Sequence, residues 1–232
     1  MGKLLSIDGS NPKIDKTQKA EAVPTRLASL SLYPDAVICA GSKAADCMGS
    51  CLKSAGMGVF SNVIAGRKAK TDWFHSDQSG FLDQLRRELS NFDKLCKRTG
   101  VVGYVRLNTI SDIAWEQFDI PQSFPDLNFY DYTKLVRRLG KTPSNYNLMF
   151  SYSGVASYRK QVERMPDGYP MAVVFKGRLP THFRGREVID GDKSDLINLR
   201  SGHVVVGLLA KGKAKHDTSG FVVDPDVIAV GG

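Results

Sequence analysis

Three of the four cysteines in the chain lie within thirteen residues, in the order Cys39, Cys47 and Cys51. Thiolates bind zinc and the iron atoms of iron–sulfur clusters. Structural zinc sites usually use two close cysteine pairs, whereas the spacing here is C-x7-C-x3-C with no second pair. Small residues within the loop would let it wrap around a bulky group. The pattern therefore favours a [4Fe-4S] cluster held by three cysteines, with one iron open to a small molecule.

Cys96, the fourth cysteine, is a candidate for the remaining metal ligand. It falls on the apolar stripe of a predicted helix over residues 79–98, together with Leu82, Leu85, Leu89 and Phe92. A free cysteine in such a stripe usually behaves as a small buried hydrophobe. Core packing is therefore the favoured interpretation of Cys96.

Two alternatives remain for the cysteine loop. In the first, zinc is the metal and a histidine completes the site, although none of the four has ligand-like spacing to the cysteines; they are His75, His182, His203 and His216. In the second, the thiols bind no metal. Clustered cysteines in a reducing compartment are more often metal ligands or catalytic groups than disulfides, which favours a metal.

Strand-like and helix-like segments alternate along most of the chain. Strands are predicted at 27–33, 101–107, 127–129, 147–150, 169–175, 187–189 and 203–210. Helical segments are predicted at 56–74, 79–98, 135–139, 155–165 and 193–199. This alternation predicts an α/β fold with a mainly parallel sheet, which forms an incomplete TIM-like barrel or a strongly curved open sheet.

We expect one domain over residues 1–232. Residues 1–26 are polar and are expected to form an N-terminal arm or a short strand. The core is expected to span 27–215, and residues 216–232 are expected to form a C-terminal tail.

Hydrogen-bonding or ionisable residues follow nearly every predicted strand. They are Asn108, Ser111, Asp112, Tyr130, Asp131, Lys134, Ser151, Ser153, Lys176, Asp190 and Asp192. The carboxyl ends of parallel strands face one side of a sheet, where binding sites form. We therefore expect most of these residues to bind a ligand beside the cysteine loop, which also follows a strand. Alternatively, Ser111, Asp131 and Asp190 are only helix caps in polar loops.

The composition indicates a globular cytoplasmic protein without a membrane segment. Apolar residues make up 42% of the chain, but no apolar run reaches the roughly 18 residues that a spanning helix needs. The N-terminus lacks the apolar core of a signal peptide. The net charge of +8 makes nucleic acid a candidate partner on charge alone, since no RNA-binding or helix-turn-helix motif accompanies the scattered basic residues.

Several strings resemble bacteriophage proteins of the gene-88 type, whose function is uncharacterised and whose outline is radical-SAM-like. The matching pieces are 10–17 (SNPKIDKT), 39–42 (CAGS) with Cys47 and Cys51, 105–113 (VRLNTISDI), 129–134 (FYDYTK), 145–151 (NYNLMFS), 188–192 (VIDGD) with Asp195, 206–208 (VGL) and 211–214 (KGKA). The resemblance implies a phage-encoded protein with a cysteine loop on a radical-SAM-like half barrel, acting in the host cytoplasm. It implies no particular reaction.

The cysteine loop departs from the radical S-adenosylmethionine enzymes that the resemblance brings in. Those enzymes use C-x3-C-x2-C with an aromatic residue before the last cysteine, whereas Ser50 stands there in this chain. The departure argues against S-adenosylmethionine cleavage and leaves cluster binding open.

Two functions are consistent with the sequence. The first is an iron–sulfur protein, either an enzyme or a degenerate relative of one, that binds a small molecule at the open iron. The second is a non-enzymatic, metal-stabilised protein that binds nucleic acid or a host factor.

Overall fold

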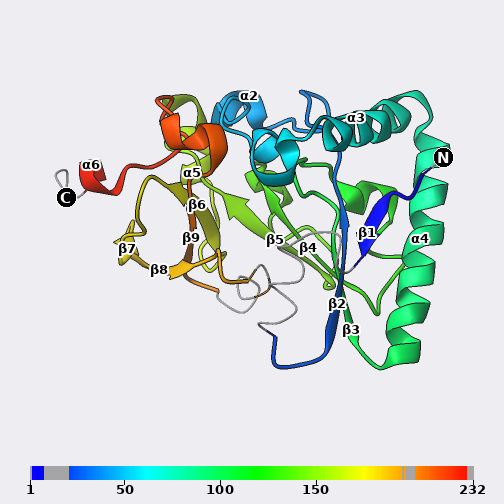
Figure 1. The fold of residues 1–232 in the computed structure, drawn as a ribbon. Helices are drawn as coiled ribbons and strands as arrows, with labels where there is room; N and C mark the ends of the chain where they lie inside the picture. The colour runs from blue at the N-terminus through cyan, green and yellow to red at the C-terminus, as the bar shows by residue number, and fades with distance from the viewer. Residues whose placement is uncertain (1, 8–20, 195, 197–201, 229–232) are drawn as a thin grey trace.

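The computed structural model describes residues 2–7, 21–194, 196 and 202–228. Its described strands form one nine-stranded sheet in the order β1-β2-β3-β4-β5-β6-β9-β8-β7 (Figure 1). The strands are β1 (Leu5–Ile7), β2 (Thr25–Leu30), β3 (Val102–Arg106), β4 (Asn128–Thr133), β5 (Tyr146–Ser151), β6 (Met171–Phe175), β7 (His182–Phe183), β8 (Arg186–Asp190) and β9 (Val205–Leu209). The fold is thus mixed α/β, as predicted.

Pairing is parallel throughout the centre of the sheet and antiparallel only at its two edges. Strands β2 to β6, β9 and β8 are parallel to one another. At the edges, β1 is antiparallel to β2, and β7 is antiparallel to β8. The central strands are rich in apolar residues because a parallel sheet is covered on both faces. The mainly parallel sheet predicted from the sequence is confirmed.

Two long helices, α3 (Ser61–Ser76) and α4 (Gln78–Thr99), pack beside the first strands (Figure 1). Asp77 caps α4 by accepting a hydrogen bond from the Gly80 backbone N–H at 2.9 Å. Gly100 ends α4 with a φ of +65°, which glycine adopts without a Cβ clash. The buried stripe of α4 is Phe81, Leu82, Leu85, Leu89, Phe92 and Cys96, which confirms the helix predicted at 79–98. No helix in the described part of the chain has the length and apolar character to cross a membrane.

Most crossovers after β3 are short, and the helical elements within them are shorter than the predicted segments. The segment predicted at 135–139 is the single 3-10 turn η4 (Val136–Arg138). The segment predicted at 155–165 contains η5 (Ala156–Tyr158) and α5 (Arg159–Glu163). The segment 193–199, predicted to be helical, lies mostly outside the described residues. The string at 10–17, which resembles the gene-88-type proteins, lies wholly outside them. The remaining short elements are α2 (Ser42–Ala45), η1 (Leu52–Ser54), η2 (Gly56–Val59), η3 (Trp115–Phe118), η7 (Gly212–His216) and α6 (Pro225–Ile228).

Both end segments contribute to the core. The backbone N–H groups of Leu4 and Leu5 donate to the Glu88 carboxylate, which holds β1 against α4. Near the C-terminus, Val223 is buried and exchanges backbone hydrogen bonds with β6. The region expected to be a tail therefore covers part of the sheet.

Candidate functional site

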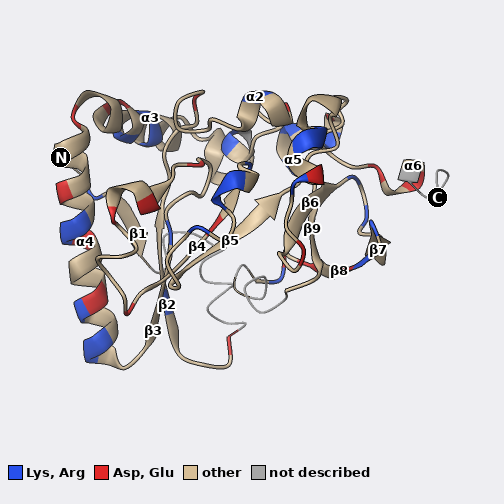
Figure 2. Ribbon diagram, turned by 180° about the vertical axis from the view of Figure 1, so that it is seen from behind, with Lys and Arg blue, Asp and Glu red and all other residues tan. Residues whose placement is uncertain are grey.

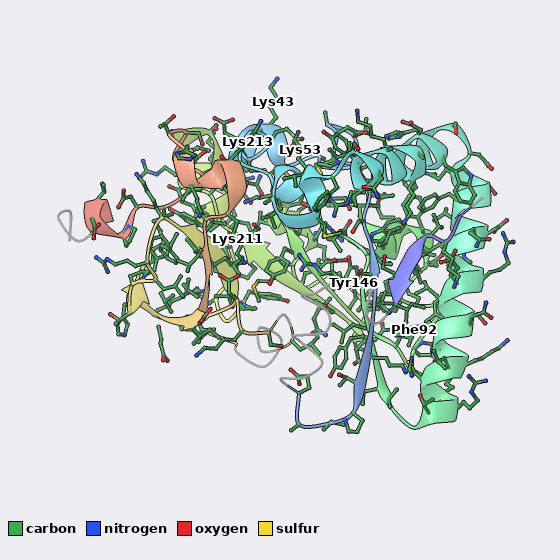
Figure 3. The ribbon with its side chains drawn as sticks, viewed as in Figure 1. Lys43, Lys53, Phe92, Tyr146, Lys211 and Lys213 are labelled. Carbon is green, nitrogen blue, oxygen red and sulfur yellow. The ribbon has the colours of Figure 1, made fainter. Side chains whose placement is uncertain are left out.

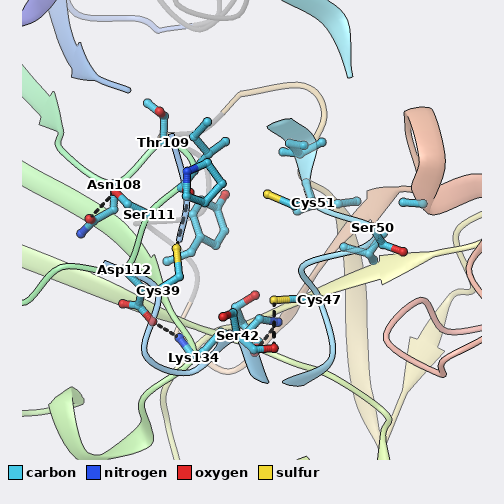
Figure 4. A pocket seen from close by; sticks show the side chains of 18 of the residues that line it. Cys39, Ser42, Cys47, Ser50, Cys51, Asn108, Thr109, Ser111, Asp112 and Lys134 are labelled. Carbon is cyan, nitrogen blue, oxygen red and sulfur yellow. Dashed lines mark hydrogen bonds between the residues drawn. The ribbon is translucent and has the colours of Figure 1, made fainter. Parts of the chain in front are cut away.

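A pocket of about 220 Å³ lies at the carboxyl ends of β3, β4, β5, β6 and β9 (Figure 4). The cysteine loop, which connects β2 to α3, forms another side of it. Nine of the predicted site residues line this pocket: Cys39, Cys47, Cys51, Asn108, Ser111, Asp112, Lys134, Ser151 and Asp192. They come together because every parallel strand of the sheet delivers its carboxyl end to the same side.

The loop holds the three cysteines around one space. A turn follows Pro34, and the backbone N–H of Ser42 donates to the Cys39 carbonyl at 2.9 Å to begin α2. Cys51 then directly precedes η1. The thiols of Cys39 and Cys47 make only long contacts, to the Ile110 carbonyl at 3.7 Å and to the Ser42 carbonyl at 3.9 Å. Figure 4 shows the three sulfur atoms bordering the pocket from different sides.

All three thiols are held in the neutral form by their surroundings. Burial raises the pKa of Cys39, and repulsion from a Cys51 thiolate adds to the increase. Burial likewise raises the pKa of Cys47 and of Cys51. Because the thiolate is the form that ligates metals, a bound metal would have to displace these protons.

The described residues contain no group of three His, Cys, Asp or Glu side chains arranged to hold a metal ion. A zinc ion with Zn–S bonds near 2.3 Å would draw tetrahedral thiolates to within about 3.8 Å of one another. A four-iron cluster needs wider spacing, because each thiolate binds a different iron. None of the four histidines lines the pocket, and His75 is instead paired with Asp35 at 2.8 Å.

Lys134 places a positive charge beside the thiols. Its Nζ donates to the carbonyls of Ser151 at 3.1 Å and Tyr152 at 2.9 Å, and lies 4.6 Å from the centre of the Phe221 ring. No described carboxylate forms an ion pair with this ammonium group. Burial lowers the pKa of Lys134 to about 8, while neighbouring Cys47 and Asp112 act in the opposite direction. The pocket therefore offers a desolvated cation to an anionic occupant.

A buried ionic network fixes the backbone of Lys134. Asp112 accepts a hydrogen bond from the Lys134 backbone N–H at 2.7 Å and one from Arg138 Nη1 at 2.6 Å. Arg138 also binds Glu116 with two hydrogen bonds of 2.8 Å each. The two hydrogen bonds between the Arg138 guanidinium and the Glu116 carboxylate orient both groups. Arg138 in turn holds Asp112, which supports the pocket wall.

Asn108 has its side chain fully engaged within the protein. Its Oδ1 accepts from Ser111 Oγ at 2.9 Å, from the Ile113 backbone N–H at 2.9 Å and from Trp115 Nε1 at 3.2 Å. Its Nδ2 donates to the Ile113 carbonyl at 3.0 Å and to Asp131 at 3.1 Å. Asn108 therefore holds the loop after β3 in its conformation.

Several predicted ligand-binding residues lie away from the pocket. Asp131 is buried and accepts from Asn108 and from the Tyr146 hydroxyl, while Tyr130 packs with Leu27 and Leu196. The physical reason is the length of β4, which continues to Thr133 instead of ending at residue 129. The strand therefore carries Tyr132 and Lys134 to the pocket, and leaves Tyr130 and Asp131 inside the sheet.

The other displaced residues have local structural roles. Asp190 accepts a hydrogen bond from the Asp192 backbone N–H, which stabilises a turn after β8. Ser153 Oγ donates to the Ala45 carbonyl, and Lys176 lies 3.5 Å from Asp224. Cys96 packs in the core near Gly103, at the amino end of β3, and does not line the pocket.

Some pocket residues were not predicted. Arg106, the last residue of β3, has its guanidinium 4.7 Å from the centre of the Tyr132 ring. Phe221 lines the pocket, although it lies in the segment expected to be a C-terminal tail. In the same segment, Asp217 accepts a hydrogen bond of 2.7 Å from Ser50 in the cysteine loop. A basic residue at the end of an apolar strand was a usable signal for Arg106. No sequence signal points from Phe221 to the cysteines.

A family model described as Gene product 88 matches residues 4–225. The chain belongs to the Gene product 88 family. This confirms the resemblance to phage proteins of the gene-88 type, and the matched residues of this Gene product 88 protein include the whole pocket lining. No curated protein and no solved structure matches the chain. The radical-SAM-like outline that the resemblance implied therefore has no support from these comparisons.

Proposed function

We propose that this Gene product 88 protein is an iron–sulfur protein in which Cys39, Cys47 and Cys51 hold a [4Fe-4S] cluster. The observation that carries the proposal is the convergence of three thiols from one loop on one pocket, beside Lys134, whose ammonium group forms no ion pair with a carboxylate of the described residues. Their spread around the pocket suits a cluster better than a single ion. Three thiolates from one loop are donors of the type that bind the irons of such clusters.

The charges around the thiols suit an anionic centre. Three thiolates would add three negative charges to a buried space, which is costly without compensation. Lys134 lies next to Cys47 and Cys51 and would supply part of that compensation. Asp112 and Arg138 keep the Lys134 backbone in place.

With three protein ligands, one iron would face the pocket and bind a small molecule there. Ser111, Ser151 and Asp192 border the same space and would orient that molecule by hydrogen bonding. Lys134 would favour a ligand with a negative group. Arg106 and Tyr132 would hold its planar or apolar part.

Purification under anaerobic conditions, followed by reconstitution with iron and sulfide, tests the proposal. We expect about four iron and four sulfide per chain, together with the visible absorbance of a cluster. Cys39→Ser, Cys47→Ser and Cys51→Ser should each lose most of the iron and sulfide.

Cys96→Ala is the matched control, because it removes the one thiol that lies outside the pocket. It should retain a full complement of iron and sulfide. Circular dichroism of each variant before reconstitution separates loss of ligands from loss of folding. Stoichiometric zinc in place of iron, or a folded wild-type protein that takes up neither metal, would refute the iron–sulfur assignment.

A further inference from the structure

Four lysines, labelled in Figure 3, lie on or directly beside three short elements that each contribute a residue to the pocket lining. Lys43 lies on α2, Lys53 on η1, and Lys211 and Lys213 at the start of η7. Elements η1 and η7 pack against each other, although about 160 residues separate them in the chain. Lys211 itself lines the pocket. We call these four residues the lysine rim.

Three members of the lysine rim have no acidic partner in the part of the chain that the structure describes. Lys43, Lys53 and Lys213 form no ion pair with any described residue, whereas Lys211 pairs with Asp192. Elsewhere many cations are neutralised locally: on α4, for example, Arg86 lies 3.5 Å from Asp83 and Lys97 lies 2.7 Å from Asp93. Figure 2 shows both signs of charge along α4, but mainly basic residues around α2 and α5. Among the described residues, three lysines on elements that border the pocket therefore carry a positive charge that no ion pair offsets.

The pocket behind the rim can accept a planar ring. The Arg106 guanidinium stacks over Tyr132 at 4.7 Å, and Val174 and Leu208 provide apolar wall. Proteins that bind single-stranded nucleic acid combine cations along the backbone path with planar side chains against which bases stack. The lysine rim would supply the cations, and Arg106 with Tyr132 would supply the planar groups.

We propose that the lysine rim binds the phosphodiester backbone of a single-stranded nucleic acid, one base of which enters the pocket. A single strand fits better than a duplex, because paired and stacked bases cannot reach a recessed site without being flipped out. An anionic lipid surface would also attract the lysines, but it would leave the recessed stack of Arg106 and Tyr132 without a role. If the cysteines hold a cluster, the base is the small molecule that enters the pocket beside Arg106 and Tyr132; binding of the backbone by the lysine rim does not depend on a cluster.

Fluorescence anisotropy with a labelled 20-nucleotide single strand of mixed sequence tests the proposal. The wild-type protein is compared with Lys43→Gln/Lys53→Gln/Lys213→Gln at several salt concentrations. Each phosphate contact contributes about 0.7 to the slope of log affinity against log salt for a single strand, so losing three contacts should reduce the slope by about 2. We also expect affinity at low salt to fall about tenfold or more.

The matched control is Lys94→Gln/Arg98→Gln/Lys141→Gln, which removes the same charge from exposed residues away from the pocket. It should leave the slope and the affinity close to wild type. Equal losses in the two triple variants, or no binding by the wild type at low salt, would overturn the proposal.

Two further probes decide the class of partner. A duplex of the same length should bind more weakly than the single strand, and equal or tighter duplex binding would overturn the single-strand assignment. Binding to phosphatidylserine vesicles, without binding to the oligonucleotide, would replace nucleic acid by a lipid surface.

Discussion

Replacing Arg138 with methionine tests the buried network that supports the pocket. The side chains of Arg138, Asp112 and Glu116 are only 5%, 7% and 14% exposed. Methionine would fill part of the space but leave both carboxylates without their cation. Removing one partner of a buried ion pair costs about 3–5 kcal/mol. In a chain of this size, each kcal/mol lowers the melting temperature by roughly 2–4 °C, so we expect a fall of roughly 6–20 °C.

Urea unfolding, followed by tryptophan fluorescence, measures the loss directly. Trp115 is fully buried and donates to Asn108, next to the network, so it reports on this region. Arg159→Met is the control, because its ion pair with Glu163 joins side chains that are 80% and 57% exposed. Such exposed pairs contribute about 0–1 kcal/mol. If Arg138→Met costs no more than Arg159→Met, the network does not stabilise the fold as we argue.

The same variant should show a diagnostic dependence on pH. Burial raises the pKa of Asp112, and Arg138 works against that rise in the wild-type protein. Without Arg138, the Asp112 carboxyl should keep its proton in the folded state at a pH where the unfolded chain releases it. The loss of unfolding free energy relative to wild type should therefore shrink as the pH falls toward about 4. A deficit that stays constant from neutral to acidic pH would show that the orphaned carboxylate is not its cause.

Two smaller predictions concern the interior of the sheet. Gly103→Ala should destabilise the protein by about 1–3 kcal/mol in urea unfolding, because a Cβ would meet Leu127 Cδ2 at 2.6 Å and Cys96 Sγ at 3.0 Å; an unchanged stability would mean that these neighbours move freely. Burial raises the pKa of Asp131 to about 7, so the folded state retains a proton that the unfolded chain loses near pH 4, and stability should fall as pH rises between about 4 and 7. Asp131→Asn should remove this contribution, so that its stability relative to wild type increases from pH 5 to pH 7.5; a constant difference in unfolding free energy would contradict the assignment.

The sequence predicted the main elements because their signals are local. The stripe from Leu82 to Cys96 has the period of a helix with one buried face, and α4 forms there. Apolar runs such as 101–107 and 169–175 correspond to β3 and β6, since strands buried on both faces read as continuous apolar segments. The gathering of Cys39 and Lys134 at one pocket followed from the direction of parallel strands.

The helical elements within the short crossovers were harder to predict, because segments of three to five residues carry too little periodicity to separate a 3-10 turn from a helix. The end of β4 was misjudged for a related reason. Polar residues within FYDYT suggested a loop, but Asp131 is satisfied by Asn108 and Tyr146. A buried carboxylate can remain inside a strand when distant residues supply its hydrogen bonds.

The α/β class, the helix α4 and the three clustered thiols could be read from residues close together in the sequence, and the alternation of strands with helices predicted the parallel centre of the sheet. Three features appear only in the folded chain: which polar residues line the pocket, the position of β9 between β6 and β8, and the contacts of Phe221 and Asp217 with the cysteine loop. These outcomes depend on contacts between residues far apart in the chain. The free energy of those contacts comes from burying apolar surface and satisfying polar groups together, and no local pattern records which distant partner does so.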